Sequence, residues 1–510
     1  MSGNQSATGR DLKKGKTSFV GKGTDLLVVG GGKSGIEACL LAQDLGASVT
    51  LVDDDRSTFS SAAWSVVEKR GGKGVGNRPI GPWVLESGFR LIVSPGVPPV
   101  KWSNEIVATP RPFVRGELEW ASSLWPLPMI AIAGSNGKST TTALIAHCLS
   151  GLGFRPFVGG NFGTPLSRGV RDLLVAQREQ RLAPYDIGVI EVSSFQTESM
   201  QEFNPLIYIL LNITPDHLDR YGDFAIYQEA KLHPVSLFSE KTTVIWNGDQ
   251  THFREGQRRS RARSAFVTRS EDKVEFGNCP VIRIENSALS GRNIPGMAEP
   301  FRLSTGSYRL VGGGNEENLA FSVLANLLFS EKMGRTVGLS DLEKEIASFS
   351  ALPHRMEKIG TVHGVTFVND SKATNVGAVE AALSGLPEKD HPWIVLIMGG
   401  RDKGGSYLPL VPGIQKNVRE VVVLGEAREK IREELSPYVG ISEVSDLNEA
   451  VSRGFSLAER GGMVLLSPAC SSYDMFHGYE ERGDRFREAV RRLKGESGRE
   501  GGTDGSGQGF

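Results

Sequence analysis

The stretch MIAIAGSNGKSTTTALIAHCL, residues 129–149, decides the fold of the middle of the chain. Its first part, Met129–Ala133, is a short apolar run that predicts a buried strand. From Lys138 onward the apolar residues recur at helical spacing, and Gly134–Gly137 forms a tight turn between strand and helix. A strand, a Gly-rich turn and a helix in this order direct backbone N–H groups and the helix N-terminus toward an anion. We therefore predict a loop that binds the phosphate groups of a nucleotide.

Two side chains beside this turn have the chemistry that such a loop needs. The ammonium of Lys138 brings positive charge toward the outer phosphates, and the hydroxyl of Ser139 can hold Mg²⁺. The spacing is G-x-x-G-K-S, shorter than in the general P-loop, because Ile132 stands where the first glycine would be. The alternative interpretation is a Gly-rich connection whose lysine is merely solvated.

Length and composition set limits on the class of protein. A chain of 510 residues is too long for one hydrophobic core, and about three domains are expected. A hydrophobic content of 39% and a charged content of 23% are typical of a soluble globular protein. The formal net charge of −1 provides no global field that attracts nucleic acid or anionic lipid. We therefore expect neither nucleic acid nor a membrane as a partner. We also expect a monomer.

The cysteines and the N-terminus indicate the compartment. The four cysteines are scattered and form no C-x-x-C pair, which argues against a disulfide framework or a zinc site and fits a reducing cytosol. The N-terminus is polar and lacks the apolar segment of a signal peptide. No apolar run approaches the roughly 18 residues needed to span a bilayer. We therefore expect a cytoplasmic protein.

A second Gly-rich turn lies near the N-terminus. Leu26–Val29 predicts a strand, Gly30–Gly35 a turn followed by a helix, and Ser48–Val52 a second strand that ends at Asp53. This is G-x-G-x-x-G with an acidic residue about 20 positions further on, the dinucleotide fingerprint. NAD or FAD would satisfy the pattern. Another nucleotide, such as a UDP group, would satisfy it equally, since the geometry requires only a diphosphate at a helix N-terminus.

Several stretches carry no clear periodicity. We expect residues 1–24 to be disordered and the tail 495–510 to be flexible, because the first is polar and the second is Gly-rich. Residues 70–82 and 159–163 predict loops, and residues 250–302 are irregular in pattern and stay unassigned. These boundaries divide the rest into three predicted domains, residues 25–125, 126–352 and 353–494.

Polar residues follow the strands predicted downstream of the phosphate loop. Glu191 ends the apolar run 186–192, and His217 follows the apolar run 206–211. A carboxylate and an imidazole beside a triphosphate can hold Mg²⁺ or orient metal-bound water, although a lone Glu at a strand end is more often a surface charge. Lys231 lies in a segment, 225–232, that predicts a helix, where a lysine is usually solvated.

The last third of the chain alternates strands with helical segments, which predicts a mostly parallel sheet and an α/β fold. Its predicted strands cover residues 365–368, 393–398, 421–424 and 463–466. Asp370, Lys372, Thr374, Lys403 and the stretch Ser467–Ser472 follow these strands. Charges of both signs at strand ends suit a small anionic or zwitterionic substrate, and helix caps or loop charges are the alternative.

Taken together, these motifs resemble the muramyl (Mur) ligase family, the ATP-dependent amide ligases of peptidoglycan precursor synthesis. The resemblance runs from about residue 25 to 490 and implies a Rossmann-like N-terminal domain, a central P-loop ATPase domain and a Rossmann-like C-terminal domain. The motifs that carry it are GSNGKST (134–140), EVSSFQ (191–196), NITPDHLDRYG (212–222), EAKL (229–232), NEEN (315–318), PHR (353–355) and DSKATN (370–375).

Three motifs are similar to the branch of the family that adds D-glutamate: DSKATN, GGRDKG (399–404) and SPACSSYDMF (467–476). This implies UDP-N-acetylmuramoyl-L-alanine and D-glutamate as substrates. Another Mur-type ligase or a folylpolyglutamate-type ligase is the closest alternative. An NAD-dependent oxidoreductase built on Gly30–Gly35 is an alternative of another class, but it leaves the phosphate loop and DSKATN unexplained.

The resemblance also implies roles for single residues in catalysis and ATP binding. The catalytic residues would be Lys138, Glu191, His217 and Lys231, with Lys231 carbamylated by CO2. Mg²⁺, with two ions expected, would be held by Ser139, Glu191, His217 and the carbamate of Lys231. ATP would contact Gly134, Ser135, Asn136, Gly137, Lys138, Ser139, Thr140, Asn315, Asn318, Arg355 and Asp370.

The remaining implied roles concern the other two substrates. The UDP-linked substrate would contact Lys33, Ser34, Asp53, Ser94, Asn161 and His217, so the resemblance favours UDP over NAD at the N-terminal turn. D-glutamate would contact Lys372, Thr374, Lys403, Ser472 and Tyr479.

Overall fold

The computed structural model describes most of the chain as two compact units. The described residues are 19–76, 90–97, 114–198, 200–270, 276–285, 288–297, 300–306, 308, 313–350, 352–384, 386 and 393–495. The expected disorder of residues 1–18, the predicted loop at 77–82 and the expected flexible tail at 496–510 therefore lie outside the described residues. The first unit comprises Met1–Ile213, Ala225–Tyr308 and Glu317–Phe349, and the second comprises Thr214–Phe224, Arg309–Glu316 and Ser350–Phe510.

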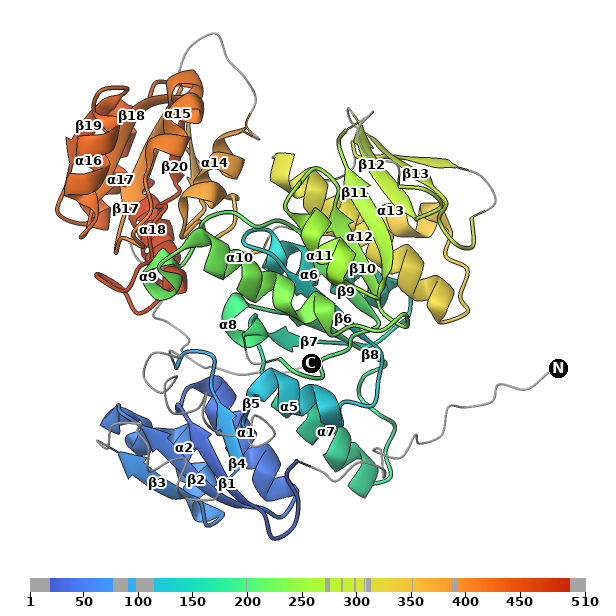
Figure 1. The fold of residues 1–510 in the computed structure, drawn as a ribbon. Coiled ribbons are helices and arrows are strands. Elements are labelled where there is room, and N and C mark those ends of the chain that lie inside the picture. The colour runs from blue at the N-terminus through green and yellow to red at the C-terminus, as the bar shows by residue number, and fades with distance from the viewer. Residues whose placement is uncertain are drawn as a thin grey trace, which may run out of the picture. The chain divides into compact units, whose positions relative to one another are not determined.

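The first unit contains a five-stranded parallel sheet near the N-terminus, drawn in blue in Figure 1, with strand order β3-β2-β1-β4-β5. Leu27, Val52 and Leu91 belong to its apolar core. Its elements are β1 (Asp25–Val29), α1 (Lys33–Asp44), β2 (Ser48–Asp53), η1 (Arg56–Ser60), α2 (Ala62–Lys69), β3 (Lys73–Gly76), β4 (Arg90–Val93), β5 (Val114–Gly116) and α5 (Glu117–Leu124).

Two expectations for this region are wrong. Lys73–Gly76, predicted as part of a loop, pairs with β2 as an edge strand, where few side chains are buried and the apolar alternation is weak. Residues 19–24, expected to be disordered, are held in place, because Val20 is fully buried and the Gly23 N–H bonds to the Gly46 carbonyl.

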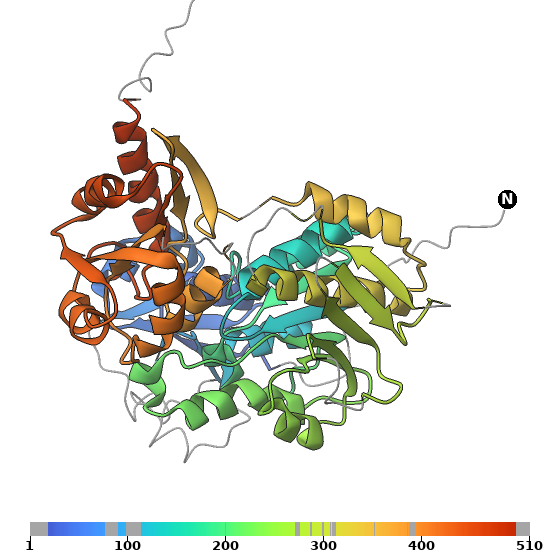
Figure 2. The ribbon, with the colours of Figure 1, turned by 90° about the horizontal axis from the view of Figure 1, so that it is seen from above.

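The same unit contains a nine-stranded sheet with the order β14-β13-β12-β11-β10-β9-β6-β8-β7. Figure 2 shows helices over both of its faces. Its first elements are β6 (Met129–Ala133), α6 (Lys138–Gly151), β7 (Pro156–Gly160), α7 (Leu166–Arg178), β8 (Ile187–Glu191), α8 (Ser194–Thr197), β9 (Ile207–Leu210), α10 (Phe224–Leu232), η4 (His233–Ser236) and β10 (Thr243–Asn247). The strand, turn and helix predicted for residues 129–149 are confirmed.

The unassigned region 250–302 is ordered where the structure describes it. It forms α11 (Phe253–Arg259), β11 (Arg263–Thr268), β12 (Val281–Glu285), β13 (Ala288–Arg292) and β14 (Phe301–Ser304). The strands β12, β13 and β14 pair antiparallel at the edge of the sheet. Strands this short give little periodicity, which is why the sequence pattern missed them. The helices α12 (Gly313–Lys332) and α13 (Leu339–Ser348) follow.

The predicted loop at 159–163 is partly wrong. Gly159 and Gly160 pair with Ile190 and Glu191 as the last residues of β7. A Cβ at Gly160 would lie 2.3 Å from the Glu191 carbonyl oxygen, so the close approach of the two strands requires glycine there.

The second unit has a six-stranded sheet with the order β15-β16-β20-β17-β18-β19, parallel except for the β15–β16 pair. Its strands are β15 (Glu357–Val362), β16 (Val365–Asn369), β17 (Ile394–Gly399), β18 (Val418–Leu424), β19 (Gly440–Glu443) and β20 (Met463–Leu466). Its helices are α9 (Leu218–Tyr221), α14 (Val376–Ser384), η5 (Leu408–Leu410), α15 (Val411–Asn417), α16 (Arg428–Leu435), α17 (Leu447–Leu457) and α18 (Tyr479–Leu493).

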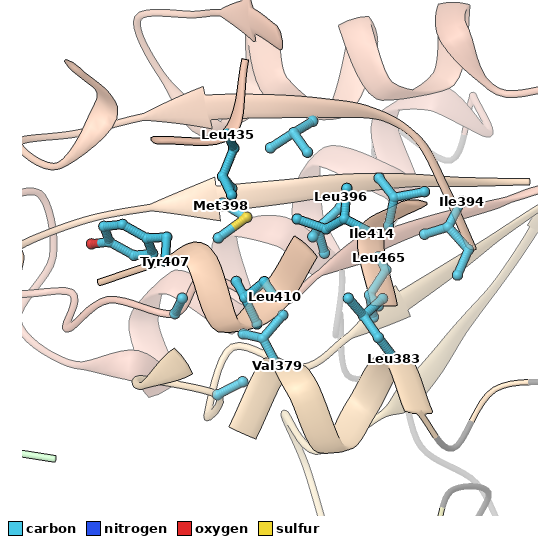
Figure 3. Close-up of a cluster of buried hydrophobic side chains, with 14 of the residues drawn as sticks. Val379, Leu383, Ile394, Leu396, Met398, Tyr407, Leu410, Ile414, Leu435 and Leu465 are labelled. Carbon is cyan, nitrogen blue, oxygen red and sulfur yellow. The ribbon is translucent and has the colours of Figure 1, made fainter. Parts of the chain in front are cut away.

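Apolar clusters cover both faces of this sheet. Figure 3 shows part of one cluster, in which Leu396 and Met398 of β17 pack against Leu383 of α14 and Ile414 of α15. The predicted α/β fold with mostly parallel sheets is confirmed. The three sheets fall within the three predicted domain ranges, and the exact boundaries stay a prediction. In the part of the chain that the structure describes, no helix has both the length and the apolar character needed to cross a bilayer.

Candidate functional site

The predicted phosphate-binding turn follows β6, an inner strand of the nine-stranded sheet. β6 pairs in parallel with β8 on one side and β9 on the other, so the C-terminal ends of the three strands share one edge. The turn Gly134–Gly137 follows β6 at this edge and leads into α6. Gly137 has φ +84°, and a Cβ there would lie 2.2 Å from the Asn318 amide oxygen. Only glycine fits this position.

Asn212, to which the sequence assigned no role, holds the turn in shape. Its backbone carbonyl accepts the Ser135 N–H at 2.8 Å, and its side-chain oxygen accepts the Asn136 N–H at 2.8 Å. Its amide also donates to the Asn136 carbonyl at 3.2 Å. In the sequence, Asn212 directly follows the apolar run 206–211, and this position could have identified it as a residue of the site. Because N–H groups of the first helical turn have no acceptor within the helix, those of α6 suit an anion.

Lys138 lies over its own turn. Its ammonium donates to the carbonyl oxygens of Gly134 at 2.8 Å and Ser135 at 2.7 Å. The alternative of a merely solvated lysine is therefore wrong for this structure. The side chain is held at the turn by neutral carbonyls, which an anionic phosphate would outcompete as a partner for an ammonium.

Glu191 ends β8 and is buried, with 3% of its surface exposed. One carboxylate oxygen accepts the Ser139 hydroxyl at 2.6 Å, and the other accepts the Asn161 side-chain amide at 2.7 Å. The surface-charge interpretation of Glu191 is therefore wrong. The structure also places Asn161, expected at the UDP-linked substrate, in contact with Glu191.

The donors around Ser139 and Glu191 fit Mg²⁺. Both are hard oxygen donors, and Mg²⁺ typically takes one or two protein oxygens and completes its shell with phosphate and water. Within the described residues, no group of three or more His, Cys, Asp or Glu side chains could hold a metal by itself. This pattern suits a metal that binds together with a nucleotide.

Lys231, on α10, is buried with 2% exposure, so the expectation of a solvated lysine is wrong. Its ammonium donates to the Gly134 carbonyl at 2.8 Å. It also lies 5.0 Å from the ring centroid of Tyr227, whose hydroxyl lies 2.8 Å from the Ser135 hydroxyl. Tyr227 was missed from the sequence, although its i, i+4 spacing to Lys231 puts both on one helix face.

The N-terminal Gly-rich turn is held by two of its predicted site residues. The Asp53 carboxylate accepts the N–H groups of Gly31 and Asp55. The Ser94 hydroxyl donates to the Gly30 carbonyl at 2.8 Å. Of the other predicted contacts, Lys33 is exposed and Ser34 half-buried at the start of α1. The turn and the helix N-terminus predicted here are confirmed, and the geometry suits a diphosphate of either kind of nucleotide.

In the second unit, Asp370 is buried at the edge where β16, β20 and β17 end. Its carboxylate accepts the Ser467 hydroxyl at 2.9 Å and the Met356 N–H at 3.2 Å. Burial raises the pKa of Asp370 to about 7, and attraction to Arg355 and Arg482 opposes that rise.

Arg482, which the sequence did not single out, ties the strand ends together. Its guanidinium is buried and donates to the Ser371 hydroxyl at 3.0 Å and to the carbonyls of Ser371 at 2.8 Å, Cys470 at 3.2 Å and Gly399 at 3.4 Å. Burial lowers its pKa to about 10. Arg482 shares a face of α18 with the apolar residue Phe486, and this helical spacing could have identified it in the sequence as a buried arginine.

The residues predicted for D-glutamate cluster at the same edge. The Lys372 ammonium lies 3.5 Å from the centroid of the Tyr479 ring, a cation–π contact. Thr374 is half-buried and its N–H donates to the Lys372 carbonyl at 2.8 Å. Ser472 is buried. Charges and hydroxyls therefore collect where three strands end.

Lys403 is paired with Asp216, which the sequence placed beside His217 without a role. The Lys403 ammonium lies 3.2 Å from one Asp216 oxygen, and the Asn375 amide donates to the other at 2.9 Å. His217 follows in the left-handed region at φ +53°, with its Nε2 3.6 Å from the Asp216 carboxylate.

The structure places some predicted partners in different units. Glu191 and Lys231 belong to the first unit, and His217 belongs to the second. Asn318 belongs to the first unit, where its side chain accepts the Thr141 hydroxyl at 3.1 Å, whereas Asn315 belongs to the second.

Comparison with known proteins identifies the class that this fold and these sites define. The Mur ligase middle domain matches residues 132–325, and the Mur ligase glutamate ligase domain matches residues 354–470. The chain belongs to the Mur ligase family. Among its relatives, the UDP-N-acetylmuramoylalanine–D-glutamate ligase of Geobacter metallireducens is 36% identical over 479 residues, covering 92% of this chain and 98% of the relative.

Solved structures of the family share the fold. MurF from Acinetobacter baumannii superposes with a TM-score of 0.56 at 16% identity, covering 87% of this chain and 91% of that one. MurF ligase from Thermotoga maritima in complex with ADP superposes with a TM-score of 0.53 at 14% identity, covering 88% and 96%.

Proposed function

We propose that this enzyme joins D-glutamate to UDP-N-acetylmuramoyl-L-alanine at the expense of ATP, releasing ADP and phosphate, in peptidoglycan precursor synthesis. The observation that carries the proposal is the phosphate-binding turn with Ser139 bonded to a buried Glu191 at 2.6 Å. The Geobacter metallireducens relative named above supports the choice of substrates.

The chemistry explains why ATP is needed. A carboxylate does not react with an amine at neutral pH, because its oxygen is a poor leaving group. Transfer of the γ-phosphoryl group to the L-alanine carboxylate makes phosphate the leaving group. The amine of D-glutamate then attacks the acyl phosphate, and the tetrahedral intermediate collapses to the amide. Two anions approach each other in the first step, so Lys138 and the N–H groups at the start of α6 would offset the repulsion.

Ser139 and Glu191 would hold Mg²⁺ when ATP is bound. The ion would neutralise phosphate charge and so lower the barrier to transfer. The protein contribution is a buried carboxylate that Ser139 and Asn161 orient by hydrogen bonds of 2.6 and 2.7 Å. His217 would contribute to a second ion and to the UDP-linked substrate, as the family resemblance implies.

Carbamylation of Lys231 would change the charge of this site. The Lys231 ammonium is buried and shares the Gly134 carbonyl with that of Lys138. Two cations on one oxygen repel each other, whereas a carbamate formed with CO2 would carry a negative charge and attract both Lys138 and Mg²⁺. Removing CO2 and bicarbonate should therefore lower kcat, and adding bicarbonate should restore it.

The remaining contacts are those that the family resemblance implies, and the turns and strand edges described above support them. Asp53, Ser94, Ser34 and Lys33 would hold the UDP part around the N-terminal turn, and Asn315, Asn318, Arg355 and Asp370 would contact ATP. The side chains at the edge of the six-stranded sheet would surround D-glutamate: Lys372, Thr374, Lys403, Ser472 and Tyr479. We also propose that the enzyme acts in the cytoplasm. We propose that it is a monomer, and sedimentation of the purified protein would test its oligomeric state.

Phosphate release tests the substrates. The enzyme is supplied with ATP, Mg²⁺ and UDP-N-acetylmuramoyl-L-alanine, and with D-glutamate, L-glutamate or meso-diaminopimelate in turn. We expect release with D-glutamate and background release with the other two. Release that favours diaminopimelate would assign the enzyme to another Mur-type reaction, and release with a folate substrate would assign it to the folylpolyglutamate type. Nicotinamide reduction without ATP turnover would overturn the proposal.

A further inference from the structure

The loop after β17, residues 400–407, carries Lys403, which the proposed function places at D-glutamate. Gly404 and Gly405 follow Lys403 directly, and Gly404 has φ +81°. Glycine restricts the backbone less than any other residue, so this segment gives Lys403 little support from the chain itself. The Lys403 ammonium itself is paired with Asp216 at 3.2 Å, and the course of the backbone on either side of Lys403 must be set by other contacts of the loop.

Asp402, the residue before Lys403, supplies such a contact. One of its carboxylate oxygens accepts the Lys430 ammonium at 2.8 Å, and the other accepts the Tyr407 hydroxyl at 3.0 Å. Lys430 also donates to the Gly405 carbonyl at 2.8 Å. The Lys430 side chain on α16 thus contacts the loop on both sides of Lys403, at Asp402 and at Gly405.

Tyr407 extends the contact to the next strand end. Its side chain is buried, with 1% exposed, at the margin of the apolar cluster in Figure 3, and its hydroxyl points away from Leu410 and Met398. The hydroxyl lies 3.1 Å from the Cys470 sulfur, two residues before Ser472. Burial raises the pKa of Tyr407, so the hydroxyl keeps its proton and can donate it to Asp402.

We propose that Asp402 and Tyr407 are positioning residues that set the distance between the Lys403 ammonium and Ser472, and thereby the length of amino acid that the enzyme accepts. The inference rests on the proposed function. Lys403 and Ser472 lie on two different strand ends, and the Asp402–Tyr407–Cys470 contacts link those two ends. Both ends would bind the acidic substrate, so a fixed separation selects one spacing of its carboxylates.

Steady-state kinetics of Tyr407→Phe tests this inference. The change keeps the buried ring and removes only the hydroxyl. Loss of one buried hydrogen bond corresponds to roughly tenfold in an equilibrium constant, so we expect KM for D-glutamate to rise about tenfold. KM for ATP should change less than about twofold, and the preference for D-glutamate over the shorter D-aspartate should fall. Tyr438→Phe, an exposed tyrosine in the same unit, is the matched control and should match the wild type.

Two further variants separate positioning from a general loss of structure. Lys430→Gln changes a half-buried side chain that contacts the loop. Because the change is not in the buried core, it should raise KM for D-glutamate as Tyr407→Phe does and leave Tm unchanged. In the double variant Asp402→Ala with Tyr407→Phe, the rise in KM should be smaller than the product of the rises in the two single variants, because both changes remove the Asp402–Tyr407 contact. Unchanged KM and D-aspartate preference in Tyr407→Phe and Lys430→Gln would overturn the inference, as would an equal rise in KM for ATP. Wild-type enzyme without D-glutamate-dependent phosphate release would instead overturn the proposed function.

Discussion

The ammonium groups of Lys138 and Lys231 donate to the same backbone oxygen, that of Gly134, each at 2.8 Å. Lys138 reaches it from the first turn of α6, and Lys231 reaches it from α10, 97 residues away from Gly134 along the chain. Two cations drawn to one carbonyl leave an excess of positive charge beside the phosphate turn. An anion at the turn would relieve that excess, and so would the carbamate proposed for Lys231.

Replacing Lys138 by Ala should abolish ADP formation, because the ammonium that would offset the charge of the outer phosphates is lost. Binding of the UDP-linked substrate should survive, since its proposed site surrounds the N-terminal Gly-rich turn. ADP release by coupled assay and substrate binding by calorimetry measure the two effects. Lys69→Ala, on the exposed side of α2, serves as the control. Retained turnover in Lys138→Ala would contradict the assignment of the turn.

Replacing Glu191 by Gln should weaken Mg²⁺ binding more than ATP binding. The amide keeps the shape of the side chain but carries no negative charge for the ion, so we expect the Mg²⁺ concentration for half-maximal activity to rise at least about tenfold. A magnesium titration at saturating ATP measures this. Glu68→Gln, at an exposed position, should leave the titration unchanged. An unaltered magnesium requirement in Glu191→Gln would remove this residue from the metal site.

Replacing Gly137 by Ala should cost more than the same change at Gly153. The two glycines have nearly the same backbone conformation, φ +84° and +81°, but a Cβ at Gly137 meets the Asn318 oxygen at 2.2 Å, whereas the nearest atom at Gly153 is 3.9 Å away. Strain of the backbone should cost about 1–2 kcal/mol of unfolding free energy in both variants. We expect Gly137→Ala to lose about 1–3 kcal/mol more and to lose ATP binding. Equal Tm values for the two variants would argue against the close contact.

Glu117 should make stability fall as the pH rises. This carboxylate, on α5, accepts the N–H and hydroxyl of Ser167 at 2.8 and 2.6 Å, and burial raises its pKa to about 7. Between about pH 4.5 and 7 the unfolded chain ionises at this group while the folded protein stays protonated, so the free energy of unfolding falls through this window. The loss is present in full above pH 7.

The variant Glu117→Gln removes this titration. Its unfolding free energy should resemble that of the wild type near pH 4.5 and should fall less steeply up to pH 7, with a difference of up to about 3 kcal/mol at pH 8. Urea unfolding at several pH values measures the slope. Parallel pH profiles for the two proteins would show that Glu117 does not titrate in this range.

Local patterns predicted much of this architecture. The apolar run 129–133, the glycines after it and the helical spacing beyond Lys138 led to the correct strand, turn and helix, because each depends on neighbours within a few residues. The same holds for the N-terminal turn at Gly30–Gly35. The strands β3 and β12–β14 were missed, because strands this short show too few apolar positions for a clear period.

The sequence by itself determined the strands beside the two Gly-rich turns, the turns themselves and the family to which the chain belongs, because these depend on the order and spacing of residues. Only the tertiary structure decided that Lys231 is buried at the Gly134 carbonyl, that Glu191 meets Ser139, and that Asp402, Tyr407 and Cys470 join two strand ends. Such contacts arise where parallel strands distant in the chain end at one edge, so the packing of the sheet rather than any local pattern brings these side chains together.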